Sequence, residues 1–97
     1  MDQFELDIKN AERELAEWKK FDFNQLNEEN IVYSNIITIL RGLASKYPKD
    51  QIKYFKMNEQ YVKQIQINLK IITDAPLMIK RYTMKIASLK QHLRIAN

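Results

Sequence analysis

Apolar residues return every three or four positions along this sequence, and little interrupts them. The clearest case is a run of five at steps of three, four, three and four: Ile79, Tyr82, Ile86, Leu89 and Leu93. This spacing places all five residues on one face of an α-helix. Because the 97 residues include one glycine and two prolines, we predict an all-helical protein.

Three earlier segments show the same spacing, so the expected helices cover residues 2–19, 27–47, 49–73 and 76–95. The expected apolar seams of the first three helices are Phe4, Ile8, Ala11, Leu15 and Trp18; Tyr33, Ile36, Leu40, Leu43 and Tyr47; and Phe55, Val62, Ile65, Leu69 and Ile72. The second seam is widened by Val32, Ile37, Ile39 and Ala44. Asn58 falls in register with the third seam, where a polar residue either fixes the packing register or lies at a solvated edge.

Capping residues and prolines set the expected helix boundaries. Asp2 can cap the first helix. Asp22 and Asn27 compete to cap the second, and we favour Asn27 because the two acidic residues after it suit a helix N-terminus. Pro48 and Pro76 are expected at the starts of the third and fourth helices, because proline fits the first turn of a helix but not its interior.

The helix lengths and short connections leave two architectures open. Connections of two or three residues favour antiparallel neighbours, and four such helices would make residues 1–97 a single domain, an antiparallel four-helix bundle. The alternative is a long helical hairpin that dimerises, with the second and third helices nearly continuous through Pro48.

Charge is divided unevenly along the chain. Residues 1–30 contain nine acidic and four basic residues, a net charge of −5, whereas residues 31–97 contain three acidic and twelve basic residues, a net charge of +9. In an antiparallel bundle the acidic first helix would flank the basic fourth helix, so these charges could be balanced within the molecule.

The alternative interpretation is a basic surface for nucleic acid or an acidic partner. Lysines follow one side of the third helix, two tyrosines are expected to run beside them, and the fourth helix adds further basic residues. The candidate residues are Lys49, Lys53, Lys56, Lys63, Lys70, Tyr54, Tyr61, Lys80, Arg81 and Lys85.

Residue types that carry catalysis or bind metals are sparse. The sequence has no cysteine and one histidine, His92, and it contains neither a glycine-rich phosphate loop nor a zinc-binding spacing. Paired acidic residues such as Glu12 and Glu14, or Glu28 and Glu29, lie two and one positions apart, so they point in different directions on a helix. We therefore expect no enzyme activity, no metal, no cofactor and no small-molecule substrate.

Composition also bears on location and source. The first residues lack the basic and apolar stretches of a secretory signal, and the most apolar window, residues 31–47, is too short and too polar to span a membrane. The lack of cysteine fits a reducing compartment, so we expect a cytoplasmic protein. Residues favoured by A/T-rich codons (Ile, Lys and Asn) make up 33 of the 97, which indicates a low-GC genome such as that of a bacterium, a phage or a plasmid.

The expected function is a non-enzymatic helical protein-binding module, acting as a small adaptor, inhibitor or regulator encoded by a phage or another mobile element. Apolar residues beside the seams form the candidate patch for self-association or a partner: Tyr33, Met57, Ile67, Ile71, Met78 and Met84. Two alternatives stay open, namely nucleic-acid binding through the third and fourth helices, and a peripheral membrane or bacteriocin-immunity type of bundle.

Overall fold

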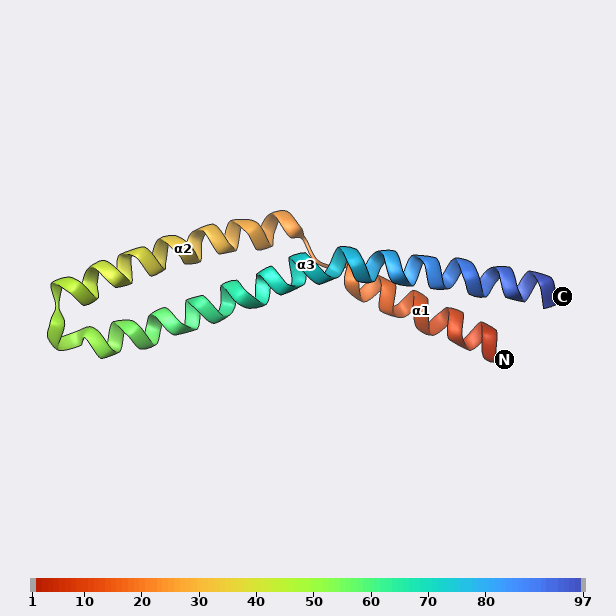
Figure 1. The fold of residues 1–97 in the computed structure, drawn as a ribbon, viewed down its shortest axis with the longest axis horizontal. Coiled ribbons are helices and arrows are strands. Elements are labelled where there is room, and N and C mark those ends of the chain that lie inside the picture. Colours follow the sequence, from red (N-terminus) through yellow and green to blue (C-terminus); the bar gives the residue numbers. More distant parts are fainter. Residues whose placement is uncertain (1, 97) are drawn as a thin grey trace. The chain divides into compact units, whose positions relative to one another are not determined.

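The computed structural model describes residues 2–96, and these residues are helical apart from short connections (Figure 1). The α-helices are α1 (Gln3–Lys19), α2 (Phe23–Lys46) and α3 (Gln51–Ala96), and the 3₁₀ turn η1 (Pro48–Asp50) joins α2 to α3. No strand occurs in the described range. The all-helical class is confirmed, but residues 2–96 form three α-helices where four were expected.

The start of α2 is set by Asp22. The Asp22 carboxylate accepts a hydrogen bond from the backbone N–H of Gln25 at 3.1 Å, as Asp2 does from Glu5 at 3.0 Å for α1. Each bond satisfies an N–H group that has no partner within the helix. The preference for Asn27 was wrong, because acidic residues in the first turn add a favourable charge but do not replace this hydrogen bond.

The helix α3 continues through Pro76, so the expected third and fourth helices are one helix of 46 residues. An interior proline costs about 3 kcal/mol, because it lacks an N–H and crowds the preceding turn. The expected boundary near Pro76 was wrong, since buried positions continue at helical spacing on both sides of the proline. At Pro48, by contrast, α2 and α3 are separated by η1, so these helices are not continuous there.

The buried side of α3 follows a heptad pattern, whose seam positions (a and d) alternate in steps of four and three. The seam runs through Tyr54, Asn58, Tyr61, Ile65, Asn68, Ile72, Ala75, Ile79, Tyr82, Ile86, Leu89 and Leu93, all buried or half-buried. The expected seam of residues 79–93 is confirmed. The expected seam of residues 49–73 was partly wrong, because Phe55 and Leu69 are 47% and 51% exposed while tyrosine and asparagine occupy the inward positions.

The chain divides into two compact units that share α3. The first unit pairs α1 with the part of α3 from Thr73 onwards, and its buried residues include Ile8, Ala11 and Ile86. The second unit pairs α2 with α3 up to Ile72. Its seam on α2 is Leu26, Asn30, Tyr33, Ile37, Leu40 and Ala44, again in steps of four and three and all buried or half-buried.

Candidate interaction surfaces

A polar cluster lies inside the contact between α2 and α3. Asn68 is 2% exposed, and its Nδ2 donates hydrogen bonds to Asn30 Oδ1 at 3.0 Å and to Glu29 Oε2 at 3.2 Å. Its Oδ1 accepts a hydrogen bond from Gln64 Nε2 at 3.2 Å. Both donors and the acceptor of this amide are satisfied within the unit, so the cluster holds α2 and α3 in register.

A second seam asparagine, Asn58, has a side-chain oxygen that is not satisfied by a hydrogen bond within residues 2–96. Its Oδ1 atom is buried and has no hydrogen-bond partner among the described residues. A buried polar atom without a partner lowers the stability of the folded state. The residue therefore weakens the seam at this point, and neither of the two interpretations drawn from its position in the sequence accounts for the buried oxygen.

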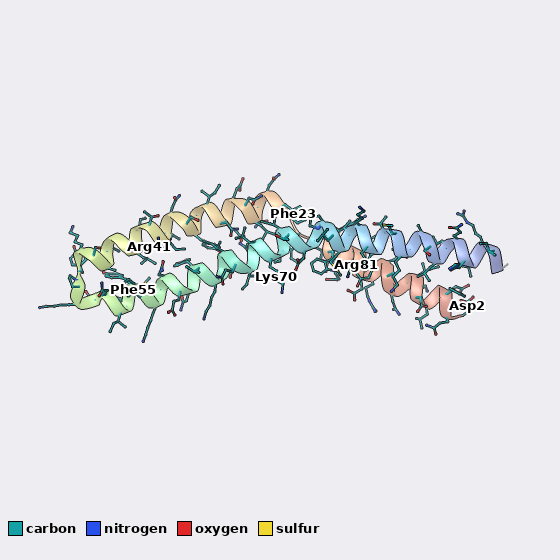
Figure 2. All side chains as sticks on the ribbon, in the orientation of Figure 1. Asp2, Phe23, Arg41, Phe55, Lys70 and Arg81 are labelled. Atoms are coloured by element: carbon teal, nitrogen blue, oxygen red, sulfur yellow. The ribbon has the colours of Figure 1, made fainter. Side chains whose placement is uncertain are left out.

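The lysines of the predicted basic surface are exposed on the second unit. Lys56, Lys63 and Lys70 recur every seven residues along α3, and Lys53 and Lys49 lie between them and the turn and are also exposed. Lys70 is labelled in Figure 2. The ion pairs found among residues 2–96 are Lys20–Glu17 at 2.8 Å and Lys90–Glu12 at 3.6 Å. None of the five lysines takes part in either pair.

The two tyrosines expected beside this lysine row lie elsewhere. Tyr54 and Tyr61 occupy the seam and are half-buried, and the centroid of the Tyr61 ring is 5.6 Å from that of Tyr33 on α2. Lys56 and Lys63 follow these tyrosines by two residues, which is about 200° around the helix. Tyr54 and Tyr61 therefore lie on the other side of α3 from Lys56 and Lys63, and the expectation that they run beside this row was wrong.

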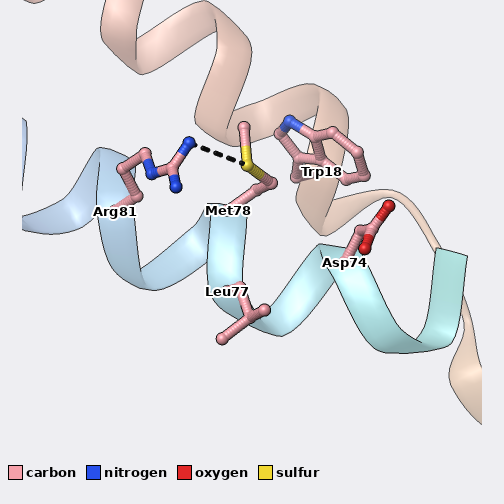
Figure 3. A pocket seen from close by; sticks show the side chains of 5 residues that line it. All are labelled: Trp18, Asp74, Leu77, Met78 and Arg81. Atoms are coloured by element: carbon pink, nitrogen blue, oxygen red, sulfur yellow. Dashed lines mark hydrogen bonds between the residues drawn. The ribbon is translucent and has the colours of Figure 1, made fainter. Parts of the chain in front are cut away.

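The other predicted basic residues lie on the first unit, where Lys80, Arg81 and Lys85 are exposed. Arg81 borders a pocket of about 310 Å³ that is lined by Trp18, Asp74, Leu77, Met78 and Arg81 (Figure 3). The Arg81 guanidinium donates to Met78 Sδ at 3.7 Å. The volume is at the lower end for ligand sites, and one carboxylate and one guanidinium define no particular ligand, so we assign none to this pocket.

The predicted apolar patch is divided between the two units. Met57, Ile67 and Ile71 belong to the second unit, whereas Met78 and Met84 belong to the first. Tyr33 is half-buried against Tyr61 and faces the seam. In the second unit Met57 is 38% exposed and Ile67 is 53% exposed.

A row of apolar residues on α2 lies beside its buried seam and was not distinguished from that seam in the sequence. This row, the α2 stripe, consists of Val32, Ile36, Ile39 and Leu43 at steps of four, three and four. Val32 and Ile39 are 53% and 62% exposed, and Ile36 and Leu43 are half-buried. The signal was present as a second helical spacing, but Ile36 and Leu43 were expected in the seam itself and Val32 and Ile39 as its widening.

The stripe is continued by α3. In heptad notation Ile36 and Leu43 occupy g positions, next to the seam, and Met57 and Ile71 are the corresponding positions of α3. Two other g residues, Glu29 on α2 and Gln64 on α3, both hydrogen-bond the Asn68 side chain. The g positions of the two helices therefore meet on one side of the contact, and most of them are apolar.

The first unit is built differently at the same positions. Its g residues on α1 are Asp7 and Glu14, and on α3 they are Met78, Lys85 and His92. On the other flank Glu12 and Lys90 form the exposed ion pair noted above. Flanks that are mostly charged or polar are typical of a pair of helices that needs no further neighbour. Mostly apolar g positions, such as those of the second unit, are typical of a helix that packs against more than one.

Sites of other kinds are not evident in the part of the chain that the structure describes. Residues 2–96 contain no group of three or more His, Asp or Glu residues placed to hold a metal ion. None of the helices in this range combines the length and the hydropathy that crossing a bilayer requires. No protein-family model, curated protein or solved structure matches this chain.

Proposed function

We propose that this protein is a non-enzymatic helical interaction module that binds protein through the α2 stripe and the adjoining flank of α3. In this role it acts as a small adaptor, inhibitor or regulator. The observation that carries the proposal is the exposure of Val32 and Ile39 beside two half-buried stripe residues, in a unit whose g positions are mostly apolar. Exposed contiguous apolar surface of this kind marks interaction sites in water-soluble folds.

The shape of this surface favours a helix as the bound element. Its residues are spaced i, i+4, i+7 and i+11 along α2, which is the spacing by which an amphipathic helix packs against another helix. On composition we also propose that the module acts in the cytoplasm of a bacterium and is encoded by a phage or another mobile element.

Affinity capture with matched variants tests the proposal. Ile31 and Ile39 lie on the same helix and are 63% and 62% exposed, but only Ile39 belongs to the stripe. We expect Ile39→Glu to abolish capture of a protein that the unmodified chain recovers, and Ile31→Glu to retain it. Recovery of neither another protein nor a second copy of this chain, or equal recovery by both variants, would contradict the proposal.

A second candidate function is nucleic-acid binding, which the unpaired lysine row on α3 favours. Because Tyr54 and Tyr61 lie in the seam, the binding expected here comes from contacts between lysines and phosphates and not from these tyrosines. Binding would therefore be independent of base sequence and would weaken steeply with salt.

A gel shift tests this second candidate. We expect binding at about 50 mM salt, where phosphate contacts are strong, and its loss when Lys56, Lys63 and Lys70 are changed to Glu. The control is Lys80→Glu with Lys85→Glu, which alters exposed charge on the first unit. An unchanged shift for the triple variant, or no shift for the unmodified protein, would exclude this function.

A further inference from the structure

We propose that the α2 stripe binds the same stripe of a second copy of this chain, with the two α2 helices antiparallel. This inference rests on the proposed function, which assigns the stripe a protein partner, and it names that partner. It is carried by a symmetry in the stripe and in the charged residues at its two ends.

The stripe and its ends form a pattern that is the same in both directions along α2. Its residues, in order, are Glu29, Val32, Ile36, Ile39, Leu43 and Lys46, at steps of three, four, three, four and three. Two antiparallel copies related by a two-fold axis between positions 37 and 38 would therefore place apolar residues opposite apolar residues. Such a contact is self-complementary, as a two-fold interface between identical subunits requires.

The pairs in this arrangement are matched in both shape and charge. Val32 lies opposite the partner subunit's Leu43, and Ile36 lies opposite the partner subunit's Ile39. Glu29 lies opposite the partner subunit's Lys46, so that each end of the contact joins an acid to a base. A parallel arrangement would instead place the two Glu29 residues together and the two Lys46 residues together, and like charges oppose association.

The hydrogen bonds of the unit position Glu29 for this contact. Asn68 Nδ2 binds Glu29 Oε2 at 3.2 Å, which holds the carboxylate at the edge of the seam and leaves Oε1 for a second donor. At the other end of the stripe, the Lys46 side chain is exposed in the last turn of α2. Neither residue has an ion-pair partner within residues 2–96.

Association through this surface would join two pairs of helices into a four-helix arrangement. Two α2–α3 pairs joined by their stripes would place four helices around a shared core, with Met57 and Ile71 of each copy beside the stripe. In a four-helix bundle each helix packs against two neighbouring helices. The residues of the stripe, together with Met57 and Ile71, would then become interior.

Sedimentation equilibrium on the full chain tests whether the stripe is the contact. We expect the unmodified protein to be a dimer, and Ile39→Glu to weaken association by at least about 100-fold, because each dimer would bury two unpaired carboxylates. Ile31→Glu, a change of the same kind at equal exposure, is expected to shift association by less than about threefold. Circular dichroism of both variants checks that the helices are intact.

Cysteine cross-linking tests the orientation, because the chain has no cysteine of its own. Val32→Cys and Leu43→Cys are mixed in equal amounts and allowed to oxidise. An antiparallel contact yields disulfides between the two different variants, whereas a parallel contact yields disulfides between identical ones. Predominance of identical pairs would overturn the antiparallel arrangement.

Other outcomes overturn the inference without affecting the proposed function. A monomer at all concentrations, or a dimer that Ile39→Glu and Ile31→Glu affect equally, would show that the stripe does not bind a second copy. If such a protein still captured a different protein in an Ile39-dependent way, the proposed function would stand and this inference would fail. If it captured none, both would fail.

Discussion

Asn58 and Asn68 stand ten residues apart in one seam, and the chemistry around each gives them opposite effects on stability. Asn68 satisfies three hydrogen bonds with residues of α2 and α3, whereas Asn58 buries an oxygen with no partner. The sequence placed Asn58 in the seam, but it could not distinguish these situations. Whether a buried amide is satisfied depends on which residues of another helix face it.

Matched leucine substitutions at these two asparagines should therefore have opposite signs. We expect Asn58→Leu to raise the free energy of unfolding by about 1–2 kcal/mol, because it removes an unpaired acceptor and adds apolar burial. Asn68→Leu should lower it by about 1–3 kcal/mol, because Asn30 and Glu29 lose their donor. Urea unfolding at one fixed protein concentration measures both, and a loss of stability at Asn58 as large as that at Asn68 would contradict the assignment.

The boundaries of the elements show where local signals suffice and where packing overrides them. The cap at Asp2 and the interruption at Pro48 follow from residue chemistry alone and were expected. The cap of α2 was misassigned because two local signals competed, and a hydrogen bond from the backbone outweighs a favourable charge. The missing break at Pro76 has a different cause, since a local preference was overcome by the continuing seam of α3.

Capping variants measure the first of these effects. We expect Asp22→Ala to lower the free energy of unfolding by about 0.5–2 kcal/mol, because the Gln25 N–H loses its acceptor. Asn27→Ala, within the first turns of α2, should change it by less than about 0.5 kcal/mol. Thermal unfolding followed by circular dichroism provides the comparison, and a larger effect at Asn27 would restore the later helix start.

Substitution of Pro76 measures the second effect. Because Pro76 lies inside α3, Pro76→Ala should restore a hydrogen bond and raise the free energy of unfolding by up to about 3 kcal/mol. If a helix instead began at this residue, proline would suit its first turn and alanine would bring no gain. Chemical unfolding of the two proteins separates the two cases.

At the scale of the whole molecule, the uneven charge distribution has a modest structural role. The acidic α1 does pair with the basic last part of α3, as an antiparallel arrangement predicts. Yet the one ion pair between these helices within residues 2–96, Glu12–Lys90, joins side chains that are 50% and 54% exposed. Such a pair contributes about 0–1 kcal/mol, so apolar packing holds the first unit together.

Self-association should be visible in the stability of the whole chain. We expect the melting temperature of the unmodified protein to rise when its concentration is increased tenfold, because a dimer is stabilised by mass action. The melting temperature of Ile39→Glu should not change with concentration, whereas Ile31→Glu should behave as the unmodified protein does. Calorimetry at two concentrations checks this, and a concentration-independent transition in the unmodified protein would contradict it.

The sequence by itself determined the helical class, the interruption at Pro48 and the buried face of residues 79–93, because these depend on local spacing and backbone chemistry. Tertiary structure decided the number of helices and which apolar row of α2 and of the first half of α3 is buried. Spacing shows that a helix has an apolar side, but two neighbouring rows of apolar residues can show the same spacing. Only the residues of the facing helix select between them, and on α2 the row left uncovered is the one that we propose binds a partner.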